Sequence, residues 1–225
     1  MKIADILSTI AGFLLSAAII ATVIDVVSFD RSFYEAEYRK NDTVSYTGMS
    51  AEDNLRATDT LLDYLQDKRQ DIVCTAEVSG TEREVFNERE TLHMVDVKAL
   101  YQNAIRVRNG CVITAAILLV LSVLIGKKSF FSVLRSGWKN GILLTGAVLL
   151  FIAIWALADF NQFWTNFHLL FFDNDLWLLD PNTSIMINLF PGSFFFDLVT
   201  RIIAWVVGIH VVISGILFGT RKVLP

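Results

Sequence analysis

Residues 3–27 read IADILSTIAGFLLSAAIIATVIDVV, and this stretch decides the class of protein. Its only charged residues are Asp5 and Asp25, and its other polar side chains are small hydroxyls. As an α-helix rising about 1.5 Å per residue, it is long enough to cross a hydrocarbon core of about 30 Å. It exceeds the roughly 7–15-residue apolar core of a signal peptide and lacks an Ala-x-Ala cleavage site. We therefore expect residues 1–28 to form a retained transmembrane helix.

Three further apolar stretches follow, at residues 110–126, 141–158 and 198–219. The chain of 225 residues is 54% hydrophobic and 19% charged, whereas soluble domains have about 25% charged residues. A chain of this size has too little polar surface to cover four such helices in water. The sequence therefore predicts a mainly α-helical membrane protein with four transmembrane helices. The formal net charge of −4 argues against nucleic acid as a partner.

Positive charges near the spans predict the orientation, because Lys and Arg collect in cytoplasmic loops. The link at residues 127–140 carries four Lys or Arg and no acid, and the tail at residues 220–225 carries two more. The loop at residues 159–197 carries five Asp and no Lys or Arg. We therefore expect both termini to be cytoplasmic, with residues 29–109 and 159–197 on the outer face of the membrane.

The first outer segment, residues 29–109, has the composition of a folded extracellular cap. It contains 27 of the 42 charged residues of the chain. Ser50-Ala51-Glu52-Asp53 resembles a helix capping box. Alternation at residues 73–78 favours a short strand, and Ser79-Gly80 favours a turn. The cap is thus predicted to be α or α+β.

A second cap helix is expected from Glu88 to about Arg108. If it continued straight into the span at residues 110–126, His93 would lie about 25 Å above the membrane surface. We therefore expect a break near Asn109-Gly110, where Gly relieves backbone strain, or a helix tilted along the membrane.

The second outer segment, residues 159–197, is unusually aromatic. It contains nine Phe and two Trp among 39 residues, against 12% aromatic residues in the whole chain. An interfacial aromatic belt is one interpretation. The segment also suits a lipid head-group site, since acidic and amide side chains interleave with the rings. The residues expected to line such a pocket are Trp164, Phe167, Phe171 and Phe172.

The three histidines are the candidates for chemistry, because the phosphate-loop, dinucleotide, zincin and Gly-x-Ser-x-Gly motifs are absent from the sequence. His210 lies in the middle of a span, where a neutral imidazole bonded across helices is expected. His93 has Glu90 and Asp96 on its own helix face, and His168 lies in the aromatic segment. Two outward histidines suit proton transfer near neutral pH. They suit a metal site with Asp173 or Asp175 less well, because the spacing fits no metal motif.

Four stretches carry a resemblance to a known family. They are FNERETLHMVDVK at residues 86–98, FHLLFFDNDLWLLDP at 167–181, YTGMS at 46–50 and LFP at 189–191. Together with the four-span layout, they resemble the bacterial lipoprotein intramolecular transacylase (Lit) family over nearly the whole chain. One departure is Gly192, where the family pattern suggests an acidic residue.

The resemblance implies an acyltransferase of the bacterial cell membrane that needs no cofactor or metal. Its substrate would be a lipoprotein whose N-terminal Cys bears a diacylglyceryl group. The sn-2 acyl chain would move to the α-amino group of that Cys, giving a lyso-form lipoprotein. The resemblance places the two catalytic histidines at His93 and His168.

Other residues are expected to support this pair, and rival functions stay open at this point. Glu90 or Asp96 is expected to orient His93, and Asn174 or the Trp177 indole to stabilise the oxyanion, with Asp175 beside them. The alternatives are a non-enzymatic accessory protein of the outer face and a metal-dependent lipid or peptide hydrolase. The sequence leaves open the oligomeric state and whether Cys74 pairs with Cys111.

Overall fold

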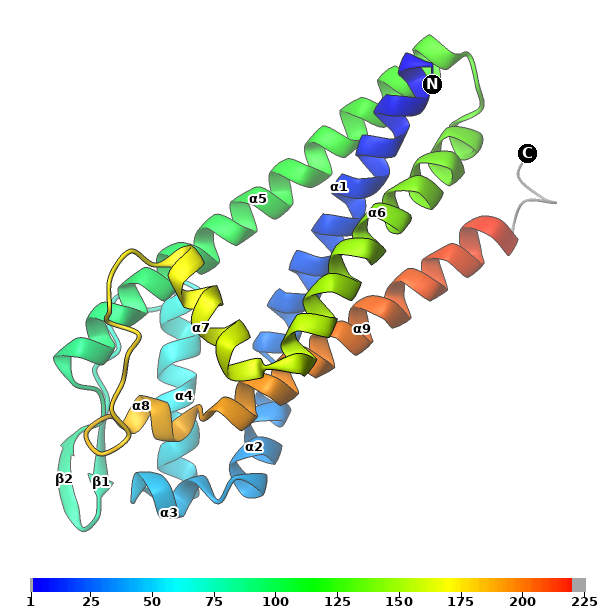
Figure 1. The fold of residues 1–225 in the computed structure, drawn as a ribbon. Helices are drawn as coiled ribbons and strands as arrows, with labels where there is room; N and C mark the ends of the chain where they lie inside the picture. Colours follow the sequence, from blue (N-terminus) through cyan, green and yellow to red (C-terminus); the bar gives the residue numbers. More distant parts are fainter. Residues whose placement is uncertain (1, 220–225) are drawn as a thin grey trace. The chain divides into compact units, whose positions relative to one another are not determined.

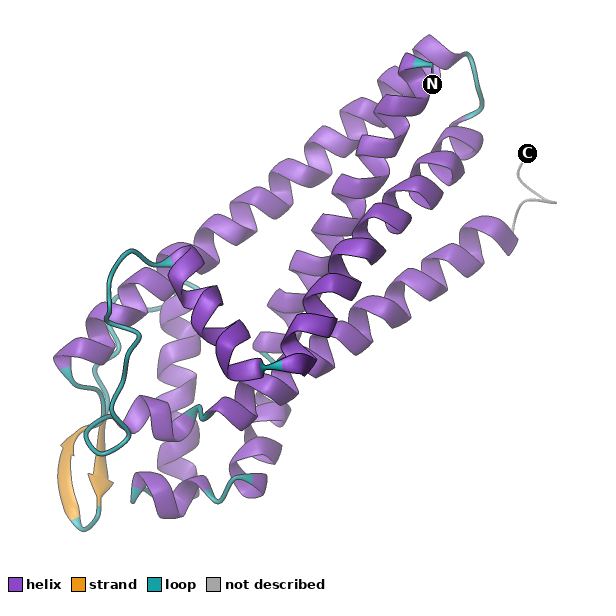
Figure 2. Cartoon of the chain, viewed as in Figure 1, coloured by secondary structure: helices purple, strands orange, loops and turns teal. Residues whose placement is uncertain are grey.

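In the part of the chain that the structure describes, most residues are helical and one small β-hairpin is present (Figure 2). The structure is a computed structural model and describes residues 2–219. The expected cytoplasmic tail at residues 220–225, with Arg221 and Lys222, lies outside the described residues. In chain order (Figure 1) the elements are α1 (Ile3–Ser28), α2 (Arg31–Lys40), α3 (Thr43–Thr47), α4 (Ala51–Leu65), β1 (Thr75–Val78), β2 (Thr81–Glu84), α5 (Glu88–Gly126), α6 (Phe130–Ala158), α7 (Phe160–Phe171), α8 (Ile185–Leu189) and α9 (Gly192–Gly219).

The four predicted transmembrane helices are confirmed as α1, α5, α6 and α9, each long and apolar enough to cross a membrane. Each of these four helices is longer than the apolar stretch from which it was predicted. The expected link at residues 127–140 is mostly helix, because the Ser129 side chain accepts a bond from the Ser132 amide and caps α6 there. The expected loop at residues 159–197 contains α7, α8 and the first residues of α9.

The predicted break near Asn109-Gly110 is wrong, because α5 runs unbroken for 39 residues. Gly in a helix interior costs only about 1 kcal/mol relative to Ala. One such residue does not interrupt a long run of backbone hydrogen bonds. Just before it, the Arg108 guanidinium binds the Asp25 carboxylate of α1 at 2.8 Å.

The described chain forms two compact units. One, called the head unit, comprises residues 28–103 and 160–199. The other, called the span unit, comprises residues 1–27, 104–159 and 200–225. Residue 1 and residues 220–225 of this unit lie outside the described part of the chain.

Small residues bring α1 and α6 together in the span unit. A Cβ atom added to Gly12 would lie 2.0 Å from the Gly137 carbonyl oxygen, and one added to Gly141 would lie 2.3 Å from the Gly12 carbonyl carbon. Gly137 and Gly141 form a Gly-x-x-x-Gly pair, which lets helix backbones touch inside a membrane. Any larger residue at these positions would force the two helices apart.

The head unit confirms several local predictions. The Ser50 hydroxyl caps α4 by accepting from the Asp53 amide at 3.0 Å. Ser79 and Gly80 both adopt positive φ, at 52° and 83°, and form the turn between β1 and β2. The expected strand at residues 73–78 is shorter, beginning at Thr75, and it pairs antiparallel with β2.

Part of the aromatic segment builds the core of the head unit instead of lining a lipid site. Tyr34 of α2 packs against Phe190 and Phe194, with ring centroids 6.1 and 5.3 Å away. Phe194 and Leu189 are almost completely buried in the same core. The remaining aromatic residues gather around α7, where His168 lies.

Candidate active site

The start of α5 fixes His93. Asn87 caps the helix by accepting from the Glu90 amide at 3.0 Å, and the Asn87 amide donates to the Glu90 carboxylate at 2.6 Å. This reciprocal pair is a capping arrangement of the kind that holds a helix terminus in one register. His93 lies one turn further on and is buried.

Glu90 also holds the segment that follows the aromatic loop. Its second carboxylate oxygen accepts from the Ser184 hydroxyl at 2.6 Å and from the Met186 amide at 2.8 Å. Its side chain is fully buried. Within residues 2–219, no hydrogen bond joins Glu90 to His93, so Glu90 connects two backbone segments and does not bond the imidazole expected to be its partner.

His168 lies on α7 and faces His93. The centroids of the two imidazole rings are 6.2 Å apart, and both side chains are buried. Nδ1 of His168 lies 2.8 Å from the carbonyl oxygen of Trp164 on the same helix. A carbonyl only accepts, so Nδ1 carries the hydrogen and Nε2 keeps a free lone pair. The two histidines that the sequence singled out therefore lie side by side.

Aromatic rings enclose the pair. Phe172 lies 5.5 Å from His93 and 5.7 Å from His168, measured between ring centroids. Trp177 stacks on His168 at 4.7 Å, and Trp164 meets it edge-on at 5.1 Å. Of the other rings expected in the pocket, Phe167 contacts His168 at 5.6 Å, whereas Phe171 packs on Phe167 and is exposed.

Burial keeps both imidazoles neutral at pH 7. Burial is the main reason why the pKa of His93 falls from 6.5 to about 4. The charge that His168 carries when protonated, and the charge of Arg89, act in the same direction, and Asp96 opposes them. Burial also lowers the pKa of His168, and the bond to Trp164 opposes this in part. Each neutral ring already holds one proton, and a second proton on one ring disfavours a second proton on the other. The pair is therefore suited to pass a single proton.

The loop after α7 is held over His168 by two residues of α5. The Asn174 amide donates to the Asp96 carboxylate at 2.8 Å, and Arg89 donates to the carbonyl of Asp175 and pairs with its carboxylate at 3.1 Å. The Trp177 indole donates to the Asn174 carbonyl at 2.9 Å. The two side chains expected to stabilise an oxyanion, Asn174 and Trp177, are thus engaged in holding the loop.

Sequence reasoning missed Arg89 and Ser184. Arg89 lies four residues before His93, so the helical repeat already placed it on the same face. Ser184 had no such signal, because its partner Glu90 lies 94 residues away in the chain.

The possible metal ligands and thiols do not assemble into a site. Within the ranges that the structure describes, no three His, Cys, Asp or Glu side chains are placed to hold a metal ion. Cys74 and Cys111 are both free thiols.

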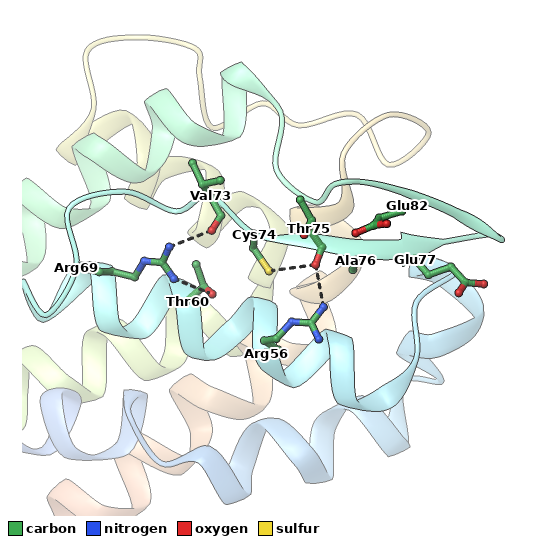
Figure 3. A pocket seen from close by; sticks show the side chains of 9 residues that line it. All are labelled: Arg56, Thr60, Arg69, Val73, Cys74, Thr75, Ala76, Glu77 and Glu82. Atoms are coloured by element: carbon green, nitrogen blue, oxygen red, sulfur yellow. Dashed lines mark hydrogen bonds between the residues drawn. The ribbon is translucent and has the colours of Figure 1, made fainter.

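A cavity of about 640 Å³ lies elsewhere in the head unit, between α4 and β1 (Figure 3). Its two guanidinium groups bind protein atoms through their terminal nitrogens, and Nε of Arg69 is buried without a hydrogen-bond partner among the described residues. Arg56 donates to the Thr75 carbonyl, and Arg69 donates to the Thr60 hydroxyl and the Val73 carbonyl. These bonds brace the hairpin against α4 and satisfy carbonyls of the strand edge, so we assign the cavity no ligand.

Comparisons with known proteins give one family model and several solved structures that are similar to this chain. A family model described as lipoprotein intramolecular transacylase Lit matches residues 9–195. Three solved structures of the membrane-integral lipoprotein intramolecular transacylase from Bacillus cereus are similar, each 20% identical over 97% of this chain. Their TM-scores are 0.74, 0.71 and 0.73, and the matches cover 97%, 93% and 94% of those chains. Two of them carry a replaced histidine, by arginine in one and alanine in the other. A search of curated protein sequences gave no match.

Proposed function

Because the chain belongs to the lipoprotein intramolecular transacylase family and is an acyltransferase, we propose that it acts on a lipoprotein with a diacylglyceryl-modified N-terminal Cys. It moves the sn-2 acyl chain from the glyceryl oxygen to the α-amino group of the same Cys. The product is an N-acylated lyso-form lipoprotein. The family match removes support from the two rival functions, the accessory protein and the metal-dependent hydrolase.

The observation that carries this proposal is the pair formed by His93 and His168. Aminolysis of an ester needs a base that takes a proton from the amine and an acid that returns a proton to the departing alkoxide. His168 presents Nε2 as an acceptor, because Nδ1 donates to Trp164. We therefore assign His168 to the amine and His93 to the glyceryl oxygen.

The proton balance of the reaction fits a neutral pair. The amine loses one proton and the glyceryl oxygen gains one, so the site has no net proton to exchange with solvent. An imidazole can accept a proton on one nitrogen and release one from the other. His168 takes the proton of the amine on Nε2 and passes it from there to His93, because its Nδ1–H donates to Trp164. His93 accepts this proton on one nitrogen and releases a proton from the other to the leaving oxygen. Repulsion between two protonated rings favours this transfer, since the pair does not hold two extra protons at once.

The aromatic rings support the folding of the substrate. Amine and ester belong to one molecule, and the reaction joins them through a ring of eight atoms: the amine nitrogen, Cα, Cβ, Sγ, two glyceryl carbons, the ester oxygen and the carbonyl carbon. Holding reacting groups in contact removes much of the entropic barrier. We propose that Trp164, Phe167, Phe172 and Trp177 form the wall that selects the bent conformer, with Phe171 at its exposed margin.

The substrate sets the proposed orientation. A lipid-anchored lipoprotein presents its N-terminus at the outer leaflet, and the distribution of Lys and Arg supports the same side for the head unit. Cysteines introduced singly at Thr81 and Lys139 should react with an impermeant maleimide from opposite sides, with Thr81 outside. Labelling of both from outside would overturn the orientation.

A crossover experiment tests the reaction itself. Two lipopeptides are mixed with the enzyme, one with an isotopically heavy sn-2 chain on a heavy peptide and one with both parts light. Mass spectrometry should show N-acylated products in which chain and peptide keep their original pairing. Products with exchanged chains would contradict intramolecular transfer. An N-acetylated lipopeptide, which has no free amine, should give no product.

A further inference from the structure

We propose that Arg89 is a third catalytic residue, whose guanidinium stabilises the negative charge on the carbonyl oxygen of the migrating acyl group. This inference rests on the proposed reaction at His93 and His168 and adds the electrostatic component that the two imidazoles do not supply. Preorganised donors aimed at a developing oxyanion commonly make one of the largest contributions to catalysis.

The position of Arg89 places its side chain on the helix face that carries His93. Arg89, His93 and Asp96 follow one another at intervals of four and three residues on α5, so they share one face of the helix. The charge of Arg89 acts at the ring of His93, where it helps to lower the pKa. A positive charge that is felt at His93 is also felt by an ester held between the two imidazoles.

Arg89 also has an unused donor. Its Nε is buried and has no hydrogen-bond partner within residues 2–219. A buried N–H without an acceptor is unfavourable, so an oxygen that reached it would satisfy this donor. The side chain as a whole is 41% exposed, so atoms of it other than Nε are accessible to substrate.

The donors that the sequence suggested for this role help to hold the loop. The Trp177 indole has a single N–H, and it donates to the Asn174 carbonyl. The Asn174 side chain donates to Asp96. Arg89 has five N–H donors, and Asp175 engages only its Nη2 end. Asp175 thereby orients a guanidinium whose remaining donors are free to face the reaction.

The electrons balance without any change in the charge of Arg89. The amine nitrogen attacks the carbonyl carbon, and the carbonyl π pair moves onto oxygen, where Arg89 binds it. The pair returns as the bond from carbon to the glyceryl oxygen breaks. The amine proton reaches the glyceryl oxygen through the imidazoles, and Arg89 stays protonated throughout.

Replacement of Arg89 separates this role from a structural one. Arg89→Met should lower kcat about 10²–10³-fold with little change in KM, as removal of an oxyanion donor does. Arg89→Lys, which keeps the charge but not the fork of donors, should recover part of the loss. A phosphonate analogue of the tetrahedral species should lose affinity for the Arg89→Met enzyme by the same factor as kcat/KM.

Two further variants serve as controls for the loop contact and for the loss of charge. Asp175→Ala removes the ion pair that orients Arg89 but keeps the guanidinium, so its loss should be less than about tenfold. Lys98→Met removes a positive charge from the same helix, where Lys98 pairs with Asp67 at 2.7 Å, and should leave kcat unchanged.

The outcomes that contradict the inference are distinct from those that contradict the proposed function. Equal losses in Arg89→Met and Asp175→Ala would mean that Arg89 only fastens the loop. A rise in KM with kcat intact would mean that it only binds substrate. Full activity in Arg89→Met would exclude both roles. If the wild-type enzyme gave no N-acylated product in the same assay, the proposed function would fail, and this inference with it. Full activity in His93→Ala and His168→Ala would contradict the roles of the two imidazoles but not acyl transfer itself.

Discussion

Two histidines in different units, the buried His168 and the half-buried His210, make the same bond and differ in their second nitrogen. His168 of the head unit places Nδ1 2.8 Å from the Trp164 carbonyl, and His210 of the span unit places Nδ1 2.7 Å from the Val206 carbonyl. Each carbonyl lies four residues earlier on the same helix. In both cases Nδ1 carries the hydrogen, and Nε2 is left as the acceptor.

The acceptor nitrogen of His210 is occupied. The Ser16 hydroxyl of α1 lies 2.6 Å from Nε2 of His210. Trp138 stacks on the imidazole, with ring centroids 5.3 Å apart. This confirms the predicted bond across helices. Nε2 of His168 has no hydrogen-bond partner among residues 2–219, and the second imidazole lies beside it. The comparison teaches that the tautomer does not distinguish the histidine that bonds across helices from the one proposed to react, and that the open acceptor nitrogen is the difference on which the proposal depends.

The largest effect is expected for His93, the other member of the proposed catalytic pair. His93→Ala should lower the rate of acyl transfer by about 10²–10⁴, the usual contribution of a proton-transfer group. The double variant His93→Ala/His168→Ala should be little slower than the single variant, because both rings act on one reaction. Initial rates in proteoliposomes check this. Losses that multiply would indicate two independent roles and would break the paired interpretation.

The pH profile should show an effect of intermediate size. Both pKa values of the pair are lowered, that of His93 to about 4, so both rings stay neutral from neutral pH upward. The α-amine of the substrate has a pKa of about 7.7–8, and kcat/KM should therefore rise until about pH 8. An inflection near pH 6.5 that disappears in His168→Ala would show that its pKa is not lowered.

The same lowered pKa values predict how stability changes with pH. In the unfolded chain the histidines titrate near 6.5, above their values in the fold. Below pH 6.5 the unfolded state therefore binds more protons, and the free energy of unfolding should fall as the pH drops from 6.5 toward 4.

The smallest effect on activity is expected when Ser16, the hydrogen-bond partner of His210 Nε2, is replaced. Ser16→Ala removes the partner of His210 and should leave the rate of acyl transfer unchanged. It should lower the free energy of unfolding by about 0.5–2 kcal/mol, as expected for a hydrogen bond between helices in a membrane. Thermal unfolding in detergent measures this. A loss of acyl transfer without a change in stability would place His210 in the reaction.

Local sequence signals predicted much of the molecule. The length of residues 3–27 predicted the membrane class, and Ser50 and Ser79-Gly80 predicted a cap and a turn, because each depends on neighbours in the chain. The pairing of His93 with His168 was suggested by their places in the two outer segments, and the family resemblance added their catalytic assignment, since no periodicity links residues 75 positions apart.

The features that the sequence did not predict depend on contacts distant in the chain. The Glu90 carboxylate reaches Ser184 and Met186, so its role is visible only in the fold. The continuity of α5 through Gly110 reflects the sum of many weak preferences, in which one glycine has little weight. The sequence suggested Trp177 as an oxyanion donor, whereas in the folded loop its indole donates to the Asn174 carbonyl.

The most direct test of the central claim is the rate of acyl transfer per folded molecule for His168→Ala and His210→Ala, measured side by side. Mass spectrometry of the lipopeptide N-terminus gives the rate, and size-exclusion chromatography gives the folded fraction. We expect His168→Ala to yield almost no lyso-form product and His210→Ala to retain the wild-type rate. Equal rates in the two variants, whether both high or both low, would contradict the claim that the open imidazole of the head unit carries the reaction.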